Sequence, residues 1–324
     1  MKIYMAPMEG ITGQIYRKAY QKNFGDVDKY FTPFISPTEN KYFTTRELNE
    51  ILPKNNEGMN TVPQILCANS SHFVKCYRDI VEFGYKEVNL NLGCPSKTVV
   101  SKSKGSGMLR DLEKLDKFLY EVFEQIGDNK ISIKTRSGFS THDEFCAILD
   151  VYNKYKLTEL IIHPRVQADF YKNEPSLTDF AYAVKESKNV LCYNGDIKTV
   201  EDYEKIKGQF DTIPAVMLGR GLIGNPALVS MIRSTQSDTI TSPDTITPPD
   251  TITPQDRKRI KNFLNDLCVE YEDVNFGGKN VLFKLKEVWF YLFDNVCEDE
   301  KLRKRLRKTE SLSEYKDIVN QIFQ

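Results

Sequence analysis

Cys94 has the surroundings best suited to chemistry in this chain of 324 residues. It follows the strand-like run Glu87–Leu92 in a Gly-Cys-Pro turn, and the proline keeps the cysteine before it out of the helical region. An unperturbed thiol, with a pKa of about 8.5, is mostly protonated at neutral pH. Because no adjacent residue suggests an activating base, the sequence favours a proton donor over a nucleophile. A buried, inert thiol is the interpretation for Cys67, Cys76, Cys146 and Cys192.

Lys134 and two glycine turns indicate an anionic ligand. A lysine at the end of the strand-like run Ile131–Thr135 is costly to desolvate unless it meets an anion, an electron-rich ring or a neighbouring carboxylate. Backbone N–H groups in Asn194-Gly195-Asp196 and Gly219-Arg220-Gly221 could bind phosphate oxygens, and Arg220 could add charge. The alternative is that these glycines only satisfy the backbone conformation.

The histidines and cysteines do not indicate a metal site. The three histidines lie in separate segments, and the seven cysteines show no C-x-x-C spacing. His163 could bind a phosphate or a substrate, or it could be a satisfied core imidazole. The odd number of cysteines favours reduced thiols. With no signal peptide and no long apolar run, we expect a cytoplasmic protein without a membrane partner.

The candidate residues lie at the ends of strand-like runs that alternate with amphipathic helical stretches. Eight such units in about 225 residues predict a parallel (β/α)8 TIM barrel, whose active site lies at the C-terminal ends of its strands. A doubly wound open sheet is the alternative, weakened by the lack of G-x-G-x-x-G after the first run. The predicted strands are Ile3–Met8, Lys29–Ser36, Thr61–Cys67, Glu87–Leu92, Ile131–Thr135, Glu159–His163, Val190–Tyr193 and Ala215–Leu218, and the helices include Ser71–Phe83, Leu112–Gln125, Thr141–Tyr155, Leu177–Glu186 and Val200–Lys207.

A proline-rich repeat separates the predicted barrel from a helical tail. Asp238–Gln255 consists of three hexads, each beginning Asp-Thr-Ile-Thr. We therefore divide the chain into a barrel (1–235), a linker (236–254) and a helical domain (255–324). Apolar spacing predicts helices at Gln255–Tyr271, Asn280–Asp294 and Ser311–Phe323. The stripe of Phe283, Trp289, Phe290, Leu292 and Phe293 is expected to be core rather than a ligand cage.

The net charge of zero, from 45 basic and 45 acidic residues, conceals one dense basic segment. Lys301–Lys308 carries six cations in eight residues, among them Arg303 and Arg305. The segment is either a solvated helix face or a contact for a polyanion. Lys279, Lys284 and Lys286 form a second candidate surface.

Several motifs, taken together, resemble the tRNA-dihydrouridine synthases, flavin enzymes that reduce uridine in tRNA. The resemblance runs through the barrel in strand order, and that family too has a helical domain after its barrel. The segment containing GCPSKTVV is the most specific part. The motifs are APMEG (6–10), NLNLGCPSKTVVSKSKGSGML (89–109), IKTRSG (133–138), NGDI (194–197) and LGRG (218–221).

The resemblance implies FMN as cofactor, NADPH as its reductant and tRNA as partner. Asn91 and Arg165 would contact the substrate and Cys94 would be the catalytic proton donor. Pro164 replaces a family glycine, which puts the contact of His163 in doubt, since proline fixes φ and removes a donor. Lys286, Arg303 and Arg305 would bind tRNA. The expected cofactor-binding residues are Pro7, Met8, Glu9, Gln64, Lys134, His163, Asn194, Gly195, Asp196, Gly219 and Arg220.

The implied reaction adds hydride from the flavin to C6 of uracil and a proton from Cys94 to C5, on a uridine extruded from the RNA. Two alternatives stay open. One is an FMN-barrel oxidoreductase for a free small molecule such as dihydroorotate, which would need no RNA-binding tail. The other is a non-catalytic RNA-binding protein. The presence of Cys94, Lys134 and Arg220 argues against it. We expect a monomer.

Overall fold

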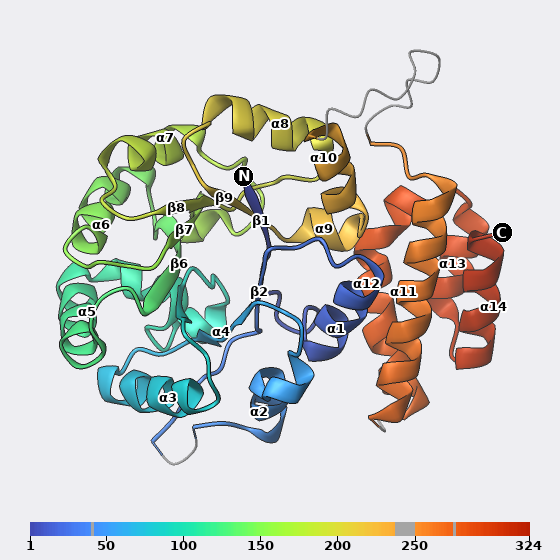
Figure 1. Ribbon diagram of the computed structural model, residues 1–324, viewed down its shortest axis with the longest axis horizontal. Coiled ribbons are helices and arrows are strands. Elements are labelled where there is room, and N and C mark those ends of the chain that lie inside the picture. The colour runs from blue at the N-terminus through green and yellow to red at the C-terminus, as the bar shows by residue number, and fades with distance from the viewer. Residues whose placement is uncertain (40–41, 237–249, 275–276) are drawn as a thin grey trace. The chain divides into compact units, whose positions relative to one another are not determined.

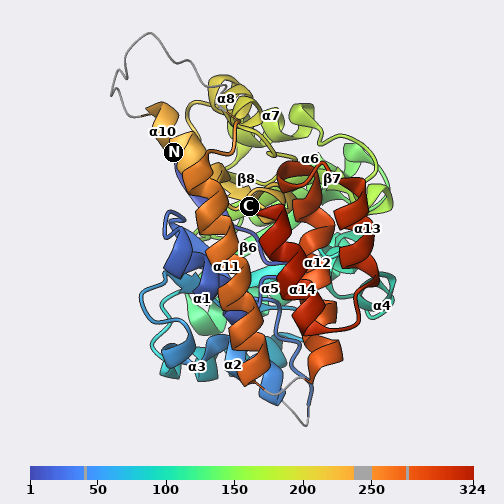
Figure 2. The same cartoon turned by 90° about the vertical axis from the view of Figure 1, so that its right-hand side faces the viewer.

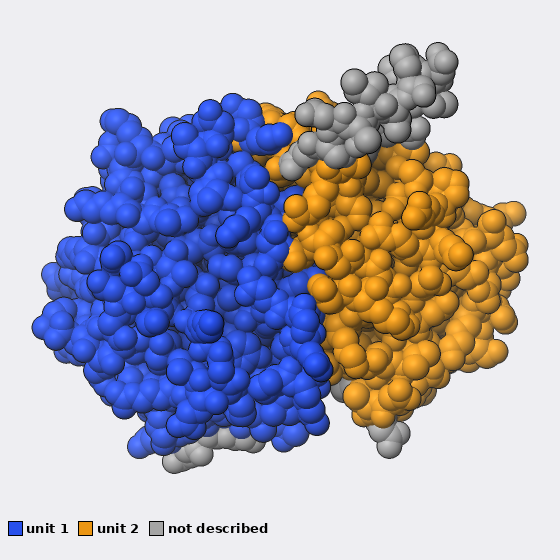
Figure 3. Space-filling model, viewed as in Figure 1, with its two compact units in different colours: residues 1–7, 28–196, 207–217 blue, residues 8–27, 197–206, 218–324 orange. Residues whose placement is uncertain are grey.

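The computed structural model describes residues 1–39, 42–236, 250–274 and 277–324. The chain forms two compact units, shown in different colours in Figure 3. We call residues 1–7, 28–196 and 207–217 the barrel unit, and residues 8–27, 197–206 and 218–324 the helical unit.

The barrel unit is built on nine parallel strands (Figure 1), in the order β3-β2-β1-β9-β8-β7-β6-β5-β4. The two end strands, β3 and β4, are consecutive in the chain and separated only by Pro63, so the sheet closes on itself at that segment. The eight predicted strands and the TIM barrel are therefore confirmed, with the third strand interrupted at the proline. The open-sheet alternative is wrong. The strands are β1 (Lys2–Met5), β2 (Lys29–Phe31), β3 (Thr61–Val62), β4 (Gln64–Ile65), β5 (Val88–Leu92), β6 (Ile131–Gly138), β7 (Leu160–Val166), β8 (Leu191–Tyr193) and β9 (Ala215–Leu218).

The strand sequences fit a sheet that is covered on both faces. Every residue of β5 and β7 is buried, as expected for parallel strands with helices outside and packed side chains inside. Apolar side chains from several strands, including Tyr4, Phe31, Ile161 and Met217, form the inner core. This packing holds the strand ends, and the polar side chains on them, in fixed positions.

Helices follow the strands around the barrel, and side-chain caps fix where several of them begin. Asn69, Asp111 and Ser176 each accept a backbone N–H from the first helical turn. The predicted helices are confirmed, except that Thr141–Tyr155 is a 3₁₀ turn (His142–Glu144) followed by a shorter α-helix. The helices are α2 (Thr45–Ile51), α3 (Ser70–Glu82), α4 (Lys97–Val100), α5 (Leu112–Ile126), α6 (Phe145–Tyr152) and α7 (Leu177–Glu186), while α8 (Val200–Gln209) has residues in both units.

The helical unit contains the C-terminal helices together with helices from earlier in the chain. Figure 2 shows α11, α12 and α14 side by side, and α1 packs on α11 while α9 packs on α12. Trp289 lies at the centre, and its indole N–H donates to the Tyr315 hydroxyl at 3.0 Å. The helices are α1 (Gln14–Asn23), α9 (Arg220–Gly224), α10 (Leu228–Gln236), α11 (Pro254–Asp273), α12 (Gly278–Val296), α13 (Glu300–Lys308) and α14 (Leu312–Ile322).

The three predicted tail helices are confirmed as α11, α12 and α14. The predicted aromatic core is right for Trp289, Leu292 and Phe293 but wrong for Phe283 and Phe290, which are 62% and 76% exposed. Most of the Asp238–Gln255 repeat lies outside the described residues, and the division into barrel, linker and helical domain stays a prediction. None of the helices that the structure describes is long and apolar enough to cross a membrane.

Candidate functional site

The barrel unit brings the predicted polar residues together at the C-terminal ends of neighbouring strands. Strand register places Asn91 of β5 beside Lys134 of β6, and Arg136 of β6 beside His163 of β7. Because all strands are parallel, these side chains lie at one end of the barrel, where TIM-barrel enzymes carry their active sites. This is the candidate site.

A ladder of amide side chains crosses the inside of this end. Asn91 Nδ2 donates to Gln64 Oε1 at 2.8 Å, and Gln64 Nε2 donates to Asn89 Oδ1 at 2.8 Å. Asn89 Nδ2 in turn donates to the Ser132 hydroxyl at 2.9 Å. No role for Asn89 or Ser132 was predicted from the sequence. They orient the amide of Gln64, and buried networks of this kind hold their members in one arrangement.

The turn that carries Cys94 is held from both sides. Asn91 Oδ1 accepts the backbone N–H groups of Cys94 and Gly93 at 2.9 and 3.1 Å. The Cys94 carbonyl accepts the Ser106 backbone N–H and hydroxyl at 3.1 and 2.8 Å. A Cβ at Gly105 would lie 2.8 Å from that carbonyl oxygen, and Gly105 has φ +56°. Glycine is therefore required there, and Cys94 is held in place by its neighbours.

Arg136 is a residue that sequence reasoning missed. It is 2% exposed, and its guanidinium donates to the carbonyls of Gly93, Val166 and Phe170 at 2.9, 2.9 and 2.8 Å. One buried cation thus ties the Cys94 turn to the segment that follows β7. Its position two residues after Lys134 on the same strand is the signal that could have identified it.

Tyr171 was also not predicted from the sequence, and it lies in the segment held by Arg136. Its ring is 5.9 Å from the His163 ring, edge to face, and the Arg136 guanidinium lies 5.3 Å from it. Phe170 before it has φ +52°, a strained conformation for a bulky residue. Tyr171, which follows this strained residue, remains 51% exposed beside the candidate site.

Lys134 is a cation in the site without a carboxylate partner among the described residues. Removal from water, and then the charge of Arg136, lower the pKa of its ammonium group to about 8. Cys94 interacts electrostatically with both Lys134 and Arg136. The excess of positive charge favours an anion or an electron-rich ring at this point, as the sequence predicted.

His163 lies in a chain of polar groups that ends at Asp196. Arg165, 1% exposed, donates to Asp196 Oδ1 and Oδ2 at 3.2 and 2.6 Å. Its Nη1 also lies 3.0 Å from His163 Nε2. Because a guanidinium can only donate, His163 Nε2 is the acceptor. The His163 ring also shares a side-chain hydrogen bond with Asn194, whose amide donates to the Met217 carbonyl at 2.8 Å. Burial, then the charges of Lys134, Arg136 and Arg165, keep the pKa of His163 well below its usual range. The imidazole is therefore neutral at pH 7.

Gly195 is the predicted turn glycine for which the barrel unit gives a clear reason. A Cβ there would overlap the Tyr193 side chain. Pro7 is half-buried, two residues after the end of β1. The other predicted cofactor residues, Met8, Glu9, Gly219 and Arg220, belong to the helical unit. There the Met8 backbone N–H donates to the Thr12 hydroxyl at 2.7 Å, and Gly219 precedes α9.

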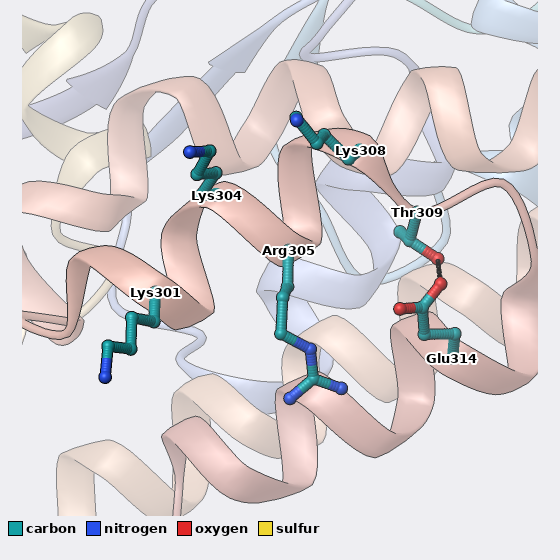
Figure 4. Close-up of a pocket in the computed structure, with 6 residues that line it drawn as sticks. All are labelled: Lys301, Lys304, Arg305, Lys308, Thr309 and Glu314. Carbon is teal, nitrogen blue, oxygen red and sulfur yellow. Dashed lines mark hydrogen bonds between the residues drawn. The ribbon is translucent and has the colours of Figure 1, made fainter.

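The helical unit separates the predicted tRNA-binding cations into two kinds. Lys286 donates to the carbonyls of Arg307 and Thr309 at 3.0 and 2.6 Å, at the C-terminus of α13. Arg303 pairs with Asp294 and Glu300 and keeps little exposed surface. Arg305 is exposed and donates to the Gln321 side chain at 3.1 Å. It lines a pocket of about 380 Å³ (Figure 4), together with Lys301, Lys304, Lys308, Thr309 and Glu314.

Comparison with known families decides what kind of barrel this is. The family model described as "Dihydrouridine synthase (Dus)" matches residues 4–317, nearly the whole chain. The chain belongs to the dihydrouridine synthase family. The resemblance stated from the sequence motifs is confirmed, and members of this family are flavin-dependent oxidoreductases.

Curated relatives agree with this assignment, and a solved structure agrees with the fold. This dihydrouridine synthase family member is 27% identical over 235 residues to tRNA-dihydrouridine synthase B of Pasteurella multocida, covering 72% of this chain and 69% of the relative. It is 28% identical over 236 residues to a tRNA-dihydrouridine(16) synthase of Pseudomonas putida, covering 70% and 72%. A variant of NCR from Zymomonas mobilis shares the fold, with a TM-score of 0.51, 16% identity and coverage of 79% of this chain and 92% of that one.

Proposed function

We propose that this protein reduces the C5–C6 double bond of a uridine in tRNA to give 5,6-dihydrouridine, with FMN as cofactor and NADPH as electron source. The observation that carries the proposal is the rigidly held Cys94 turn beside two cations, Lys134 and Arg136, in the barrel of a dihydrouridine synthase family member. The names of the relatives support tRNA as the substrate.

The barrel unit fits a flavin. Lys134 is desolvated and has no carboxylate partner among the described residues. A buried cation of this kind is expected to bind an anionic or electron-rich ligand. Gln64 and Lys134 are proposed to bind the ring or ribityl, with Pro7 alongside, and His163 to contact the cofactor as a neutral imidazole. Asn194, Gly195 and Asp196 are proposed for the phosphate end, where the carboxylate of Asp196 is already paired with Arg165. Met8, Glu9, Gly219 and Arg220 are carried over from the sequence resemblance alone.

Bound FMN supplies the hydride that adds to C6 of the uracil ring. The protein's part is to position the base and to deliver a proton. The thiol of Cys94 is proposed as the acid that protonates C5. Loss of that proton leaves a thiolate, and the nearby charges of Lys134 and Arg136 stabilise it. Asn91 and Arg165 are proposed on the substrate side, although both also hold neighbouring groups in place.

A uridine stacked in folded RNA cannot enter a barrel, so the base must be extruded before it reacts. The helical unit is proposed to bind the surrounding RNA, with Arg305 and the other exposed cations of α13 in contact with phosphates. Arg303 and Lys286 are proposed to act by shaping this surface, since both bind other groups of the unit.

The test is a reconstitution. Purified protein should take up FMN, turn yellow, be reduced by NADPH and form dihydrouridine in unmodified tRNA, detected by mass spectrometry of digested RNA. A protein that binds no FMN would end the flavin assignment. A flavoprotein that oxidises a free small molecule such as dihydroorotate, but forms no dihydrouridine in tRNA, would establish the alternative of a free substrate.

A further inference from the structure

Two aromatic rings on α12 are exposed where the sequence predicted core. Phe283 and Phe290 are 62% and 76% exposed and lie seven residues apart, two turns along the same face of the helix. Two large rings on one face of a helix, bordered by polar residues, are typical of an interaction surface. Lys286 lies between them, three residues after one ring and four before the other, so all three share one face.

This face is continuous with the basic pocket of α13. The Lys286 ammonium donates to the Thr309 carbonyl at 2.6 Å, and Thr309 itself lines the pocket (Figure 4). On the other side, the Lys284 ammonium lies 5.9 Å from the centre of the Phe283 ring, but it is paired with Glu287 at 2.9 Å and is not counted in this surface. Rings and cations therefore form one surface of the helical unit, which we call the ring–cation surface: Phe283, Lys286, Phe290, Lys301, Lys304, Arg305 and Lys308.

The four α13 cations of this surface are available to a ligand, whereas Lys286 is bound to the carbonyls at the end of α13. Lys301, Lys304 and Lys308 form no ion pair with any carboxylate in the described parts of the chain, and Arg305 donates only to the neutral amide of Gln321. Of the six residues that line the pocket, Glu314 is the acid, and it accepts the Thr309 hydroxyl at 2.8 Å. Four cations and one carboxylate line the pocket, so it has an excess of positive charge that suits phosphate groups.

We propose that the ring–cation surface binds unpaired nucleotides of the RNA substrate, with Phe283 and Phe290 stacking on bases while the α13 cations contact the adjoining phosphates. This inference rests on the proposed RNA substrate and adds that the helical unit recognises a loop rather than a stem. Aromatic rings interleaved with cations are the pattern by which proteins hold single strands, because every base offers a flat face. Bases inside a duplex are stacked on each other and offer no such face.

The test compares RNAs that differ only in pairing. Binding of full-length protein to a single-stranded oligonucleotide, to a blunt duplex containing it and to unmodified tRNA is measured at several salt concentrations. The variants are Phe283→Leu and Phe290→Leu, which keep apolar bulk, and Phe290→Trp, which keeps stacking. Tyr120→Leu is the matched control, since Tyr120 is 59% exposed on α5 of the barrel unit.

Each leucine variant should weaken binding of the single strand roughly 5- to 100-fold, with less than about a 2-fold effect on the duplex and an unchanged salt slope. Phe290→Trp and Tyr120→Leu should bind as wild type does. Lys304→Gln with Lys308→Gln should instead flatten the salt slope, by about 0.7 for each phosphate of the single strand that the protein no longer neutralises.

Equal losses on duplex and single strand, or no loss in the leucine variants, would overturn the proposal. So would a wild-type dimer that Phe283→Leu and Phe290→Leu convert to monomer, because the rings would then belong to a protein interface. Reduction of FMN by NADPH should be unchanged in every variant. If the wild type fails to form dihydrouridine but still shows the ring-dependent preference for single strands, the catalytic assignment has failed and the RNA surface has not.

Discussion

The side-chain oxygen of Asn91 accepts the backbone N–H of Cys94 at 2.9 Å, while its amide nitrogen donates to Gln64 at 2.8 Å. One side chain thus sets both the turn that presents the thiol and the orientation of a proposed flavin ligand. A residue in this position should affect the chemistry mainly through Cys94.

Asn91→Ala should therefore lower dihydrouridine formation about 10- to 100-fold, because small displacements of a catalytic group are costly. Asn91→Asp keeps the oxygen that accepts from Cys94 and should lose less. The double variant Asn91→Ala with Cys94→Ala should be no slower than Cys94→Ala alone, since the two residues act as one unit. If the rate loss of the double variant in single-turnover assays equals the product of the two single losses, Asn91 acts independently of the thiol.

Gly105→Ala should disturb the same turn from its other side. The added methyl group would press on the Cys94 carbonyl at 2.8 Å, and φ +56° adds strain. Gly58→Ala is the matched control, because Gly58 also has positive φ (+74°) but no atom near the added carbon. Both variants should lose about 1 kcal/mol of stability from backbone strain, measured by urea unfolding. Gly105→Ala should in addition lose most turnover, and equal turnover in the two variants would mean that the turn tolerates displacement.

Lys134 should make flavin binding depend on pH. The pKa of the Lys134 ammonium group is about 8 in the folded protein, below the ordinary value of 10.5. Below pH 8 the buried lysine is charged, and this charge lowers the free energy of unfolding. Between these two values the unfolded chain holds a proton that the folded chain has lost, so stability rises with pH. Lys134→Met should stabilise the FMN-free protein at pH 7 by about 1–3 kcal/mol, with the gain disappearing toward pH 10.5.

Bound flavin would favour the charged lysine, so wild-type FMN affinity should fall as pH rises through about 8. Lys134→Met should bind FMN weakly and without that dependence, as measured by quenching of flavin fluorescence. A wild-type affinity that is flat across this range would remove Lys134 from the flavin site.

Asp196→Asn should destabilise the barrel unit by leaving a buried guanidinium without its carboxylate. Arg165 is 1% exposed in its side chain and Asp196 29%, so we expect a loss of about 2–3 kcal/mol, less than for a fully buried pair. Asp116→Asn breaks the exposed pair with Lys154 and should cost under about 1 kcal/mol. Equal unfolding midpoints in urea for the two variants would contradict the structural role of the Arg165–Asp196 pair.

The sequence predicted the barrel well because each strand is a short apolar run followed by a glycine or polar turn. It predicted the position of Cys94 for the same reason. It assigned Arg136 no role. Its spacing from Lys134 places it on the same face of β6, but the three carbonyls that it meets come from distant segments. Nor could the sequence predict that Phe283 and Phe290 are exposed while Trp289 is buried. The apolar spacing of α12 does not show how much of the helix its neighbours cover.

The cations of α13 show the same limit. Six of the eight residues of Lys301–Lys308 are basic, but only the fold reveals that Arg303 is paired with acids, while Lys304 and Lys308 pair with no acid among the described residues. Spacing along the chain predicts a charged segment, and contacts between helices decide which charges remain available.

The most direct test of the account is single-turnover dihydrouridine formation by FMN-loaded, NADPH-reduced enzyme on unmodified tRNA, comparing wild type with Cys94→Ala. The variant should hold FMN and accept electrons from NADPH as wild type does, yet form dihydrouridine about 10²- to 10⁴-fold more slowly, the usual effect of losing a general acid. Dihydrouridine formation by Cys94→Ala at the wild-type rate would contradict the assignment of Cys94 as the proton donor.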